Sequence, residues 1–228
     1  GRDVEAVTDA VAPVPTAIQY PPLGTAHAVL AARDEIADFH GDILILFGDT
    51  PLLTRQTMEM MLDARRDPAD PAVVVLGFRP DDPAQYGRLV ADANGALNAI
   101  VEYRDATPEQ RDIPICNAGI MAVDGKHLFE LLDAVDNDNA KEEYYLTDIV
   151  AIARGKGLSC AVTEVEDERE VMGVNGRAEL AIAESIMQER LRNAALANGA
   201  TLTDPSTVYF SFDTILGRDV TVGPNVVF

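Results

Sequence analysis

The side chains best suited to chemistry stand where apolar runs of this sequence end. Asp49 follows the apolar run at residues 42–47 and precedes Thr50-Pro51. In open α/β sheets, ligands bind at the carboxyl ends of the strands, and a carboxylate there can hold Mg²⁺ as a hard oxygen ligand. The competing interpretation is an aspartate that caps the turn at Thr50-Pro51. Asp49 is therefore a candidate metal ligand on position alone.

Other polar residues also allow two interpretations, one as a ligand contact and one as a purely structural residue. Glu102 ends a predicted strand, where it can accept hydrogen bonds from sugar hydroxyls or simply be solvated. Gly87 can allow close approach of a ligand to the backbone, or it can mark a bulge. Asn117 and Asn175 lie beside apolar runs, where an asparagine more often forms a turn than a ligand contact. We find no Ser-His-Asp arrangement, Walker A loop or HExxH motif.

Composition narrows the classes of ligand. The chain has 228 residues, with 18 Lys and Arg against 38 Asp and Glu, and a net charge of −20. This charge disfavours nucleic acid and anionic membranes as partners, and a nucleotide ligand would need a divalent metal to neutralise its phosphates. No 18-residue apolar run or signal peptide is found, and the two cysteines lack metal-ligand spacing. These features predict a cytoplasmic chain.

The elements that must position these residues alternate along the chain. We expect strands at residues 42–47, 72–76, 120–123 and 159–165, and a hairpin of 86–90 with 97–103 around Asn94-Gly95. Helices are expected from the cap Thr25, over 54–66, after residue 123 through 132, over 142–153 and over 177–198. Continuous apolar strands alternating with helices predict an α/β fold, a three-layer sandwich with a mostly parallel sheet.

The last residues of the chain show a different sequence pattern. Residues 216–221 and 222–227 are two successive hexads, and each opens with an aliphatic residue followed by glycine. A six-residue period is typical of a left-handed parallel β-helix, although two hexads can also form an ordinary hairpin. The chain begins at Gly1 and stops within this pattern, so we expect it to be cut at both ends.

The motifs together resemble one family, the uridylyltransferase half of the bacterial bifunctional N-acetylglucosamine-1-phosphate uridylyltransferase/glucosamine-1-phosphate N-acetyltransferase. The match is collinear from about residue 19 to residue 228. Its segments are Gln19, Leu23-Gly24-Thr25-Ala26-His27-Ala28, Phe47-Gly48-Asp49-Thr50-Pro51-Leu52, Tyr86-Gly87-Arg88, Ile100-Val101-Glu102-Tyr103, Asn117-Ala118-Gly119-Ile120, Glu143-Tyr144-Tyr145-Leu146-Thr147-Asp148 and Gly173-Val174-Asn175.

The resemblance implies a nucleotide-diphospho-sugar transferase, a Rossmann-like fold, that uses UTP and N-acetylglucosamine 1-phosphate to make UDP-N-acetylglucosamine. It implies that Asp49 and Asn175 hold Mg²⁺ and that Gln19, Gly24 and Thr25 hold the uracil. Phe47 and Gly48 belong to the substrate-binding segment, with Phe47 where a tyrosine is common. The implied sugar pocket consists of Gly87, Glu102, Asn117, Tyr145 and Thr147.

The same resemblance implies a domain plan. Residues 1–175 would form the nucleotidyltransferase domain without its glycine-rich loop, 176–199 a linker helix, and 200–228 the first coil of the β-helix that makes the family a homotrimer. With that loop absent, and with Arg88 and Arg104 poorly placed to replace its cations, we expect no activity from this chain alone. The alternatives are another hexose-1-phosphate nucleotidyltransferase, and a non-catalytic assembly or regulatory homologue.

Overall fold

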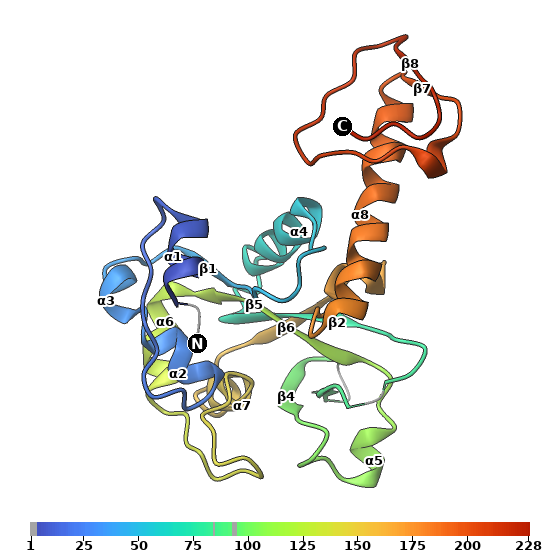
Figure 1. Ribbon diagram of the computed structural model, residues 1–228. Coiled ribbons are helices and arrows are strands. Elements are labelled where there is room, and N and C mark those ends of the chain that lie inside the picture. The colour runs from blue at the N-terminus through green and yellow to red at the C-terminus, as the bar shows by residue number, and fades with distance from the viewer. Residues whose placement is uncertain (1–3, 84, 93–94) are drawn as a thin grey trace. The chain divides into compact units, whose positions relative to one another are not determined.

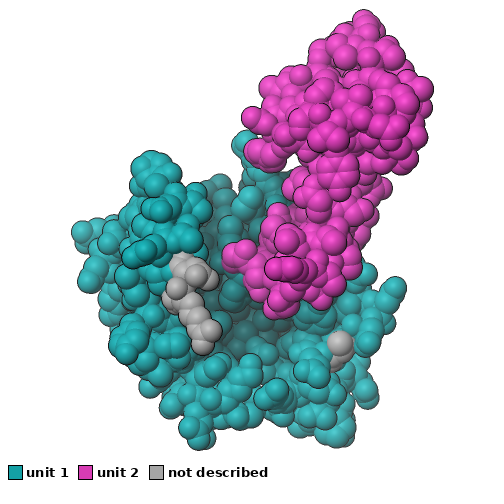
Figure 2. Space-filling model, viewed as in Figure 1, with its two compact units in different colours: residues 1–47, 53–168 teal, residues 48–52, 169–228 magenta. Residues whose placement is uncertain are grey.

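The computed structural model describes residues 4–83, 85–92 and 95–228. The chain forms two compact units, which Figure 2 shows in different colours. Unit 1 comprises residues 1–47 and 53–168, and unit 2 comprises residues 48–52 and 169–228. Each unit is described separately below.

Unit 1 is built on a mixed six-stranded sheet in the order β4-β3-β5-β2-β6, with β1 paired to β5. Only the pairing of β2 with β6 is parallel among the described strands of this sheet, and the other pairings are antiparallel. The strands are β1 Asp42–Ile45, β2 Val73–Phe78, β3 Arg88–Ala91, β4 Leu97–Val101, β5 Cys116–Asp124 and β6 Cys160–Glu164.

Helices cover both faces of this sheet (Figure 1). Alternate residues of the fully buried strand β2 serve the two faces, and Val73 and Val75 pack into the cluster formed with α6 and α7. Helix α4 packs against β1, β2, β5 and β6. The helices of this unit are α1 Val4–Val11, α2 Thr25–Leu30, α3 Arg33–Ile36, α4 Arg55–Arg65, α5 Pro108–Arg111, α6 Gly125–Leu132 and α7 Asp148–Gly155.

A buried ion cluster fastens α4 to the sheet. The guanidinium of Arg65 donates to Asp124 Oδ2 at 2.9 Å and to the Pro71 carbonyl at 2.9 Å. Asp42 and Asp70 complete its charge partners at 3.3 Å and 2.9 Å. Since a buried charge is tolerated only with partners of this kind, the cluster fixes where the helix lies on the strands.

Three expectations from the sequence are wrong in detail. The sheet is mixed rather than mostly parallel, because an apolar run reports burial and carries no information about strand direction. Thr25 begins α2 but does not cap it: Gly24 holds the cap position, and the Thr25 hydroxyl accepts from Leu146 N at 2.9 Å. The helix expected at residues 142–153 begins only at Asp148.

Other expectations are confirmed. Strands β3 and β4 pair antiparallel as the hairpin predicts, although Asn94 of its turn lies outside the described residues. Helix α4 begins after the cap Thr54, whose hydroxyl accepts from Thr57 N at 3.2 Å. None of the helices in the described ranges combines the length and apolarity that crossing a membrane requires.

Unit 2 contains a 21-residue helix, α8 Arg177–Ala197, followed by a short coil. Strands β7 Thr201–Leu202 and β8 Thr221–Val222 pair parallel, and Tyr209 and Val227 form a further parallel bridge. Gln188 of α8 is buried, and its amide donates to the Phe210 carbonyl and accepts from Phe210 N, both at 2.8 Å. These two hydrogen bonds satisfy the buried backbone groups of Phe210 and attach the coil to α8.

Candidate functional site

Glu102 is the central carboxylate of unit 1. It follows β4 directly, is half-buried, and accepts a hydrogen bond from the Thr147 hydroxyl at 3.5 Å. Burial raises the pKa of this carboxyl above its ordinary value, while the Lys141 ammonium and the Thr147 hydrogen bond oppose the rise. A half-buried carboxylate with one weak partner retains lone pairs for further donors, such as sugar hydroxyls.

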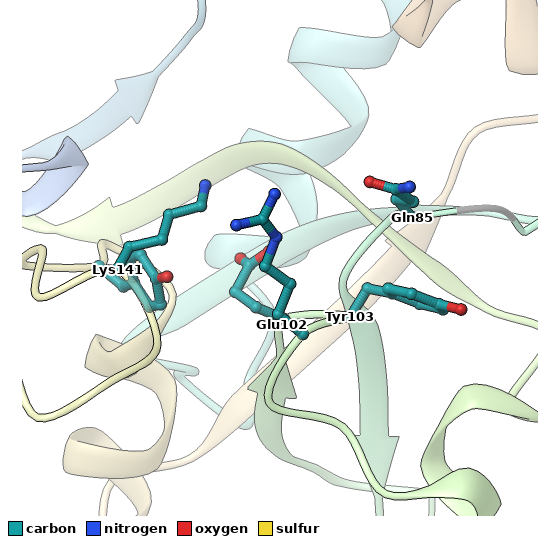
Figure 3. Close-up of a pocket in the computed structure, with 6 residues that line it drawn as sticks. Gln85, Glu102, Tyr103 and Lys141 are labelled. Carbon is teal, nitrogen blue, oxygen red and sulfur yellow. The ribbon is translucent and has the colours of Figure 1, made fainter.

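Two adjoining cavities share Glu102 and Tyr145. One has a volume of about 120 Å³, and Figure 3 shows Lys141 on one side of Glu102 with Gln85 and Tyr103 on the other. The second, of about 220 Å³, is strongly acidic. The first is lined by Gln85, Glu102, Tyr103, Arg104, Lys141 and Tyr145. The second is lined by Ile100, Val101, Glu102, Asp105, Asp138, Asn139, Tyr145 and Asp148.

The Gly87 backbone lies beside Glu102. A Cβ added to Gly87 would lie 3.5 Å from Glu102 Oε1, and the Gly87 carbonyl accepts from Asn117 N at 2.8 Å. The Asn117 side chain accepts from Gly119 N at 2.9 Å, and Gly119 has a φ of +84°. The ring of Phe47 occupies the space that a Gly119 side chain would need. The structure thus brings Gly87, Asn117 and Thr147 to the surroundings of Glu102.

The segment of Gln19, Gly24 and Thr25 is held against residues 144–146. Gln19 Nε2 donates to the Gly24 carbonyl at 2.8 Å. Gly24 has a φ of +121°, and a Cβ there would lie 2.4 Å from the Tyr144 carbonyl oxygen. Only glycine fits such an approach, so this position fixes the segment beside Tyr145.

Asp49 and Asn175 meet in unit 2. From the position of a Cβ built on Gly173, Asn175 Nδ2 lies at 3.6 Å and Asp49 Oδ2 at 3.9 Å. The backbone joins the same segments, because Val174 N donates to the Asp49 carbonyl at 2.7 Å. Both side chains are exposed, and the adjacent Gly48 has open space where its side chain would be. The two groups therefore converge over a glycine that leaves room between them.

This pair fits a magnesium ion by its donor chemistry. A carboxylate and an amide carbonyl are hard oxygen donors, and rotation of the Asn175 amide exchanges its oxygen and nitrogen. No cluster of three or more His, Cys, Asp or Glu suited to a metal occurs among the described residues. Two protein ligands are consistent with Mg²⁺, which commonly takes its remaining ligands from water and substrate phosphates.

Sequence reasoning gave no role in the sugar pocket to three charged residues that line the two cavities, Arg104, Lys141 and Asp148. Asp148 is half-buried, and burial, followed by Asp136, Glu102 and Asp105, raises the pKa of its carboxyl to about 6. Lys141 lies outside the family motifs, and Arg104 directly follows the motif segment that ends at Tyr103. Arg88, by contrast, is buried, and its guanidinium donates to the carbonyls of Pro83, Tyr86 and Arg111.

The comparisons of this sequence with known proteins agree on one family. The nucleotidyl transferase family model matches residues 5–165. The bifunctional protein GlmU of Paramagnetospirillum magneticum is 62% identical over 229 residues, covering 100% of this chain and 50% of that protein. Those of Rhodospirillum rubrum and Brucella anthropi are 61% and 51% identical, over 96% and 100% of this chain. The chain spans about half the length of the curated relatives it matches.

Proposed function

Because this chain belongs to the nucleotidyl transferase family, we propose that it forms the uridylyltransferase half of a bifunctional enzyme. In the proposed reaction, a phosphate oxygen of N-acetylglucosamine 1-phosphate attacks the α-phosphorus of UTP. UDP-N-acetylglucosamine and pyrophosphate are the products. The observation that carries the proposal is the convergence of Asp49 and Asn175 over Gly173, because this family resemblance implies a metal at these two residues.

The Asp49–Asn175 pair would bring the positive charge of a metal ion to a chain of net charge −20. Asp49 and Asn175 would hold Mg²⁺, and the bound ion would neutralise negative charge on the reacting phosphates. The pairing of Val174 N with the Asp49 carbonyl holds the two segments together before any ligand binds. Such preorganisation matters because phosphoryl-type transfers depend mainly on positioning and electrostatic stabilisation.

The two cavities that share Glu102 and Tyr145, together called the Glu102 pocket, are the proposed sugar site. Glu102 would accept hydrogen bonds from sugar hydroxyls, and Thr147 would orient it through the 3.5 Å contact. Gly87 lets the backbone approach the ligand, while Asn117 and Tyr145 would supply further polar contacts. Gln19, Gly24 and Thr25 are proposed to hold the uracil, with Phe47 and Gly48 in the same substrate-binding segment.

The remaining features of the proposal concern the full-length protein. Residues 1–175 would be its nucleotidyltransferase domain, 176–199 a linker helix and 200–228 the start of a left-handed β-helix. The parallel pairing of β7 with β8 supports that start. The full-length protein would be a cytoplasmic homotrimer that also acetylates glucosamine 1-phosphate.

The test is pyrophosphate release from UTP, Mg²⁺ and N-acetylglucosamine 1-phosphate by the full-length protein and its Asp49→Ala variant. We expect turnover to be abolished, because removing a metal ligand removes the charge that it holds, while the fold survives at this exposed loop position. Asp81→Ala, an exposed loop aspartate outside the site, is the matched control. Wild-type turnover in Asp49→Ala would refute the metal assignment, and equal turnover with glucose 1-phosphate would refute the sugar assignment.

A further inference from the structure

We propose that Arg88 and Arg111 are positioning residues that hold Tyr103 and so fix Glu102 in the Glu102 pocket. The inference rests on the proposed function, since it adds to the same pocket two residues that act through Tyr103 without touching the sugar. Tyr103 follows Glu102 in the chain, and both line the cavity of about 120 Å³ (Figure 3). Arg88 belongs to β3 and Arg111 to α5, and neither is among the described residues that line the two cavities.

Tyr103 is held at its ring and at its backbone by these two arginines, which we call the arginine clamp. The guanidinium carbon of Arg111 lies 4.6 Å from the centre of the Tyr103 ring, and that of Arg88 lies 5.9 Å from it. Arg111 Nε donates to the Tyr103 carbonyl at 3.2 Å, and Arg88 Nε donates to the Arg111 carbonyl at 3.2 Å. Cation–π contacts strengthen when they are desolvated, so the burial of Arg88 favours this arrangement.

Arg88 also connects the clamp to a second wall of the cavity. It is 2% exposed, and its guanidinium donates to the Pro83 carbonyl at 3.3 Å and to the Tyr86 carbonyl. These two residues stand on either side of Gln85, which lines the same cavity as Tyr103. The planar guanidinium presents donors in several fixed directions, which the single ammonium group of lysine does not. One buried arginine therefore ties the Gln85 wall to the Tyr103 wall.

The local structure of α5 places Arg111 for this contact. The Thr107 hydroxyl accepts from Gln110 N at 3.3 Å, and the Gln110 side chain accepts from Thr107 N at 2.9 Å, which completes a capping box. Pro108 stands at the start of the helix, where its fixed φ is favourable. A helix of four residues is marginal by itself, so these caps and the bond from Arg88 to the Arg111 carbonyl hold it in place.

Glu102 depends on its neighbour because the sheet ends before it. It follows Val101, the last residue of β4, and its carbonyl accepts from Asp105 N at 3.0 Å. The hydrogen bond from Thr147 is 3.5 Å long, at the limit of such contacts. Burial raises the pKa of the Glu102 carboxyl, because the charged form loses hydration there. If Tyr103 were released, the carboxylate would regain water by turning outward, and the sugar would lose its acceptor.

The test is steady-state kinetics of the full-length protein with Mg²⁺, varying N-acetylglucosamine 1-phosphate or UTP. Arg88→Lys and Arg111→Gln should each raise the KM for the sugar phosphate about three- to tenfold, with kcat and the KM for UTP within about twofold of wild type. The double variant should have the KM of the more affected single variant, because both residues act through Tyr103. Multiplied effects in the double variant would overturn this shared action.

Arg65→Lys is the matched control, because Arg65 is a second buried arginine of unit 1 and lies in the ion cluster under α4. It should lower the melting temperature and leave both KM values unchanged, which separates positioning from a general loss of stability. Arg111 is only half-buried, so Arg111→Gln carries the test if Arg88→Lys does not fold.

Glu102→Gln separates the clamp from the proposed sugar site. If Glu102→Gln raises the KM for the sugar phosphate while the folded Arg88→Lys and Arg111→Gln variants keep the wild-type value, the clamp is overturned and the sugar pocket stands. If Glu102→Gln also keeps the wild-type KM, the proposed sugar pocket fails and this inference fails with it.

Discussion

Substituting Gly173 by alanine probes the metal pair without removing a ligand. The added Cβ would lie 3.6 Å from Asn175 Nδ2 and 3.9 Å from Asp49 Oδ2, which are ordinary van der Waals distances. Gly173 does not have a positive φ, so alanine is compatible with its backbone. The fold should therefore be kept, and a loop glycine replaced without strain commonly stabilises a protein by about 0.4–1 kcal/mol.

The metal should nevertheless be affected strongly. Mg²⁺ binds oxygen at about 2.0–2.1 Å with near-octahedral geometry and usually retains several waters. A methyl group within 3.9 Å of both proposed ligands takes room that those waters require. Changes beside metal ligands typically cost about 10–100-fold in affinity or activity. We expect the Mg²⁺ concentration for half-maximal activity to rise about tenfold, which corresponds to about 1.4 kcal/mol.

The assay is pyrophosphate release by the full-length protein as a function of Mg²⁺ concentration. Gly155→Ala is the control, because Gly155 ends α7 and a Cβ there meets no atom within 4 Å. Thermal denaturation of each variant checks the fold. An unchanged Mg²⁺ requirement in a folded Gly173→Ala variant would show that the ion does not occupy the space over Gly173.

Three further predictions concern stability. Asp148→Asn should stabilise the protein by about 1 kcal/mol at pH 7 and should have no effect at pH 3, as measured by urea unfolding. The reason is that the pKa of Asp148 is raised from 3.8 to about 6 in the folded state, so the free energy of unfolding falls as the pH rises from 3.8 to 6. An equal effect at pH 3 and pH 7 would contradict this. Arg65→Met should cost about 3–5 kcal/mol, because it leaves the Asp124 carboxylate buried without a counter-charge, and a cost below about 1 kcal/mol would contradict this. Gly24→Ala should lower the melting temperature, because its Cβ overlaps the Tyr144 carbonyl, and an unchanged temperature would refute the predicted strain.

The sheet illustrates what the sequence could predict and what it could not. The apolar run at residues 42–47 predicted a strand, and the continuous apolar strands together predicted a mostly parallel sheet. The structure has β1 there, but it is half-buried and antiparallel to β5, with Ile45 opposite Met121. Hydrophobicity depends on burial, whereas direction depends on which strand pairs with which. That pairing is a long-range property that one apolar run does not contain.

Asp49 and Asn175 show what sequence motifs can and cannot predict about a site. They are separated by more than 120 residues, and only the family resemblance linked them; spacing along the chain did not. The structure places both beside Gly173, and the pairing of Val174 N with the Asp49 carbonyl explains how the backbone achieves it. Their proximity supports a shared ligand, whose identity the Mg²⁺ titration tests.

The loop before α7 shows why Lys141 escaped sequence reasoning. Residues 142–153 were expected to be helical, but the start of that range is committed to other partners. Glu142 has a φ of 55°, and the Asn139 side chain captures the Glu143 carbonyl. Tyr144 pairs through its backbone with Leu23 and Ala26. Asparagine side chains compete with helical hydrogen bonds, so the helix is delayed until Asp148. A helix starting at residue 142 would break these contacts; the observed loop instead holds the Lys141 ammonium at the Glu102 pocket.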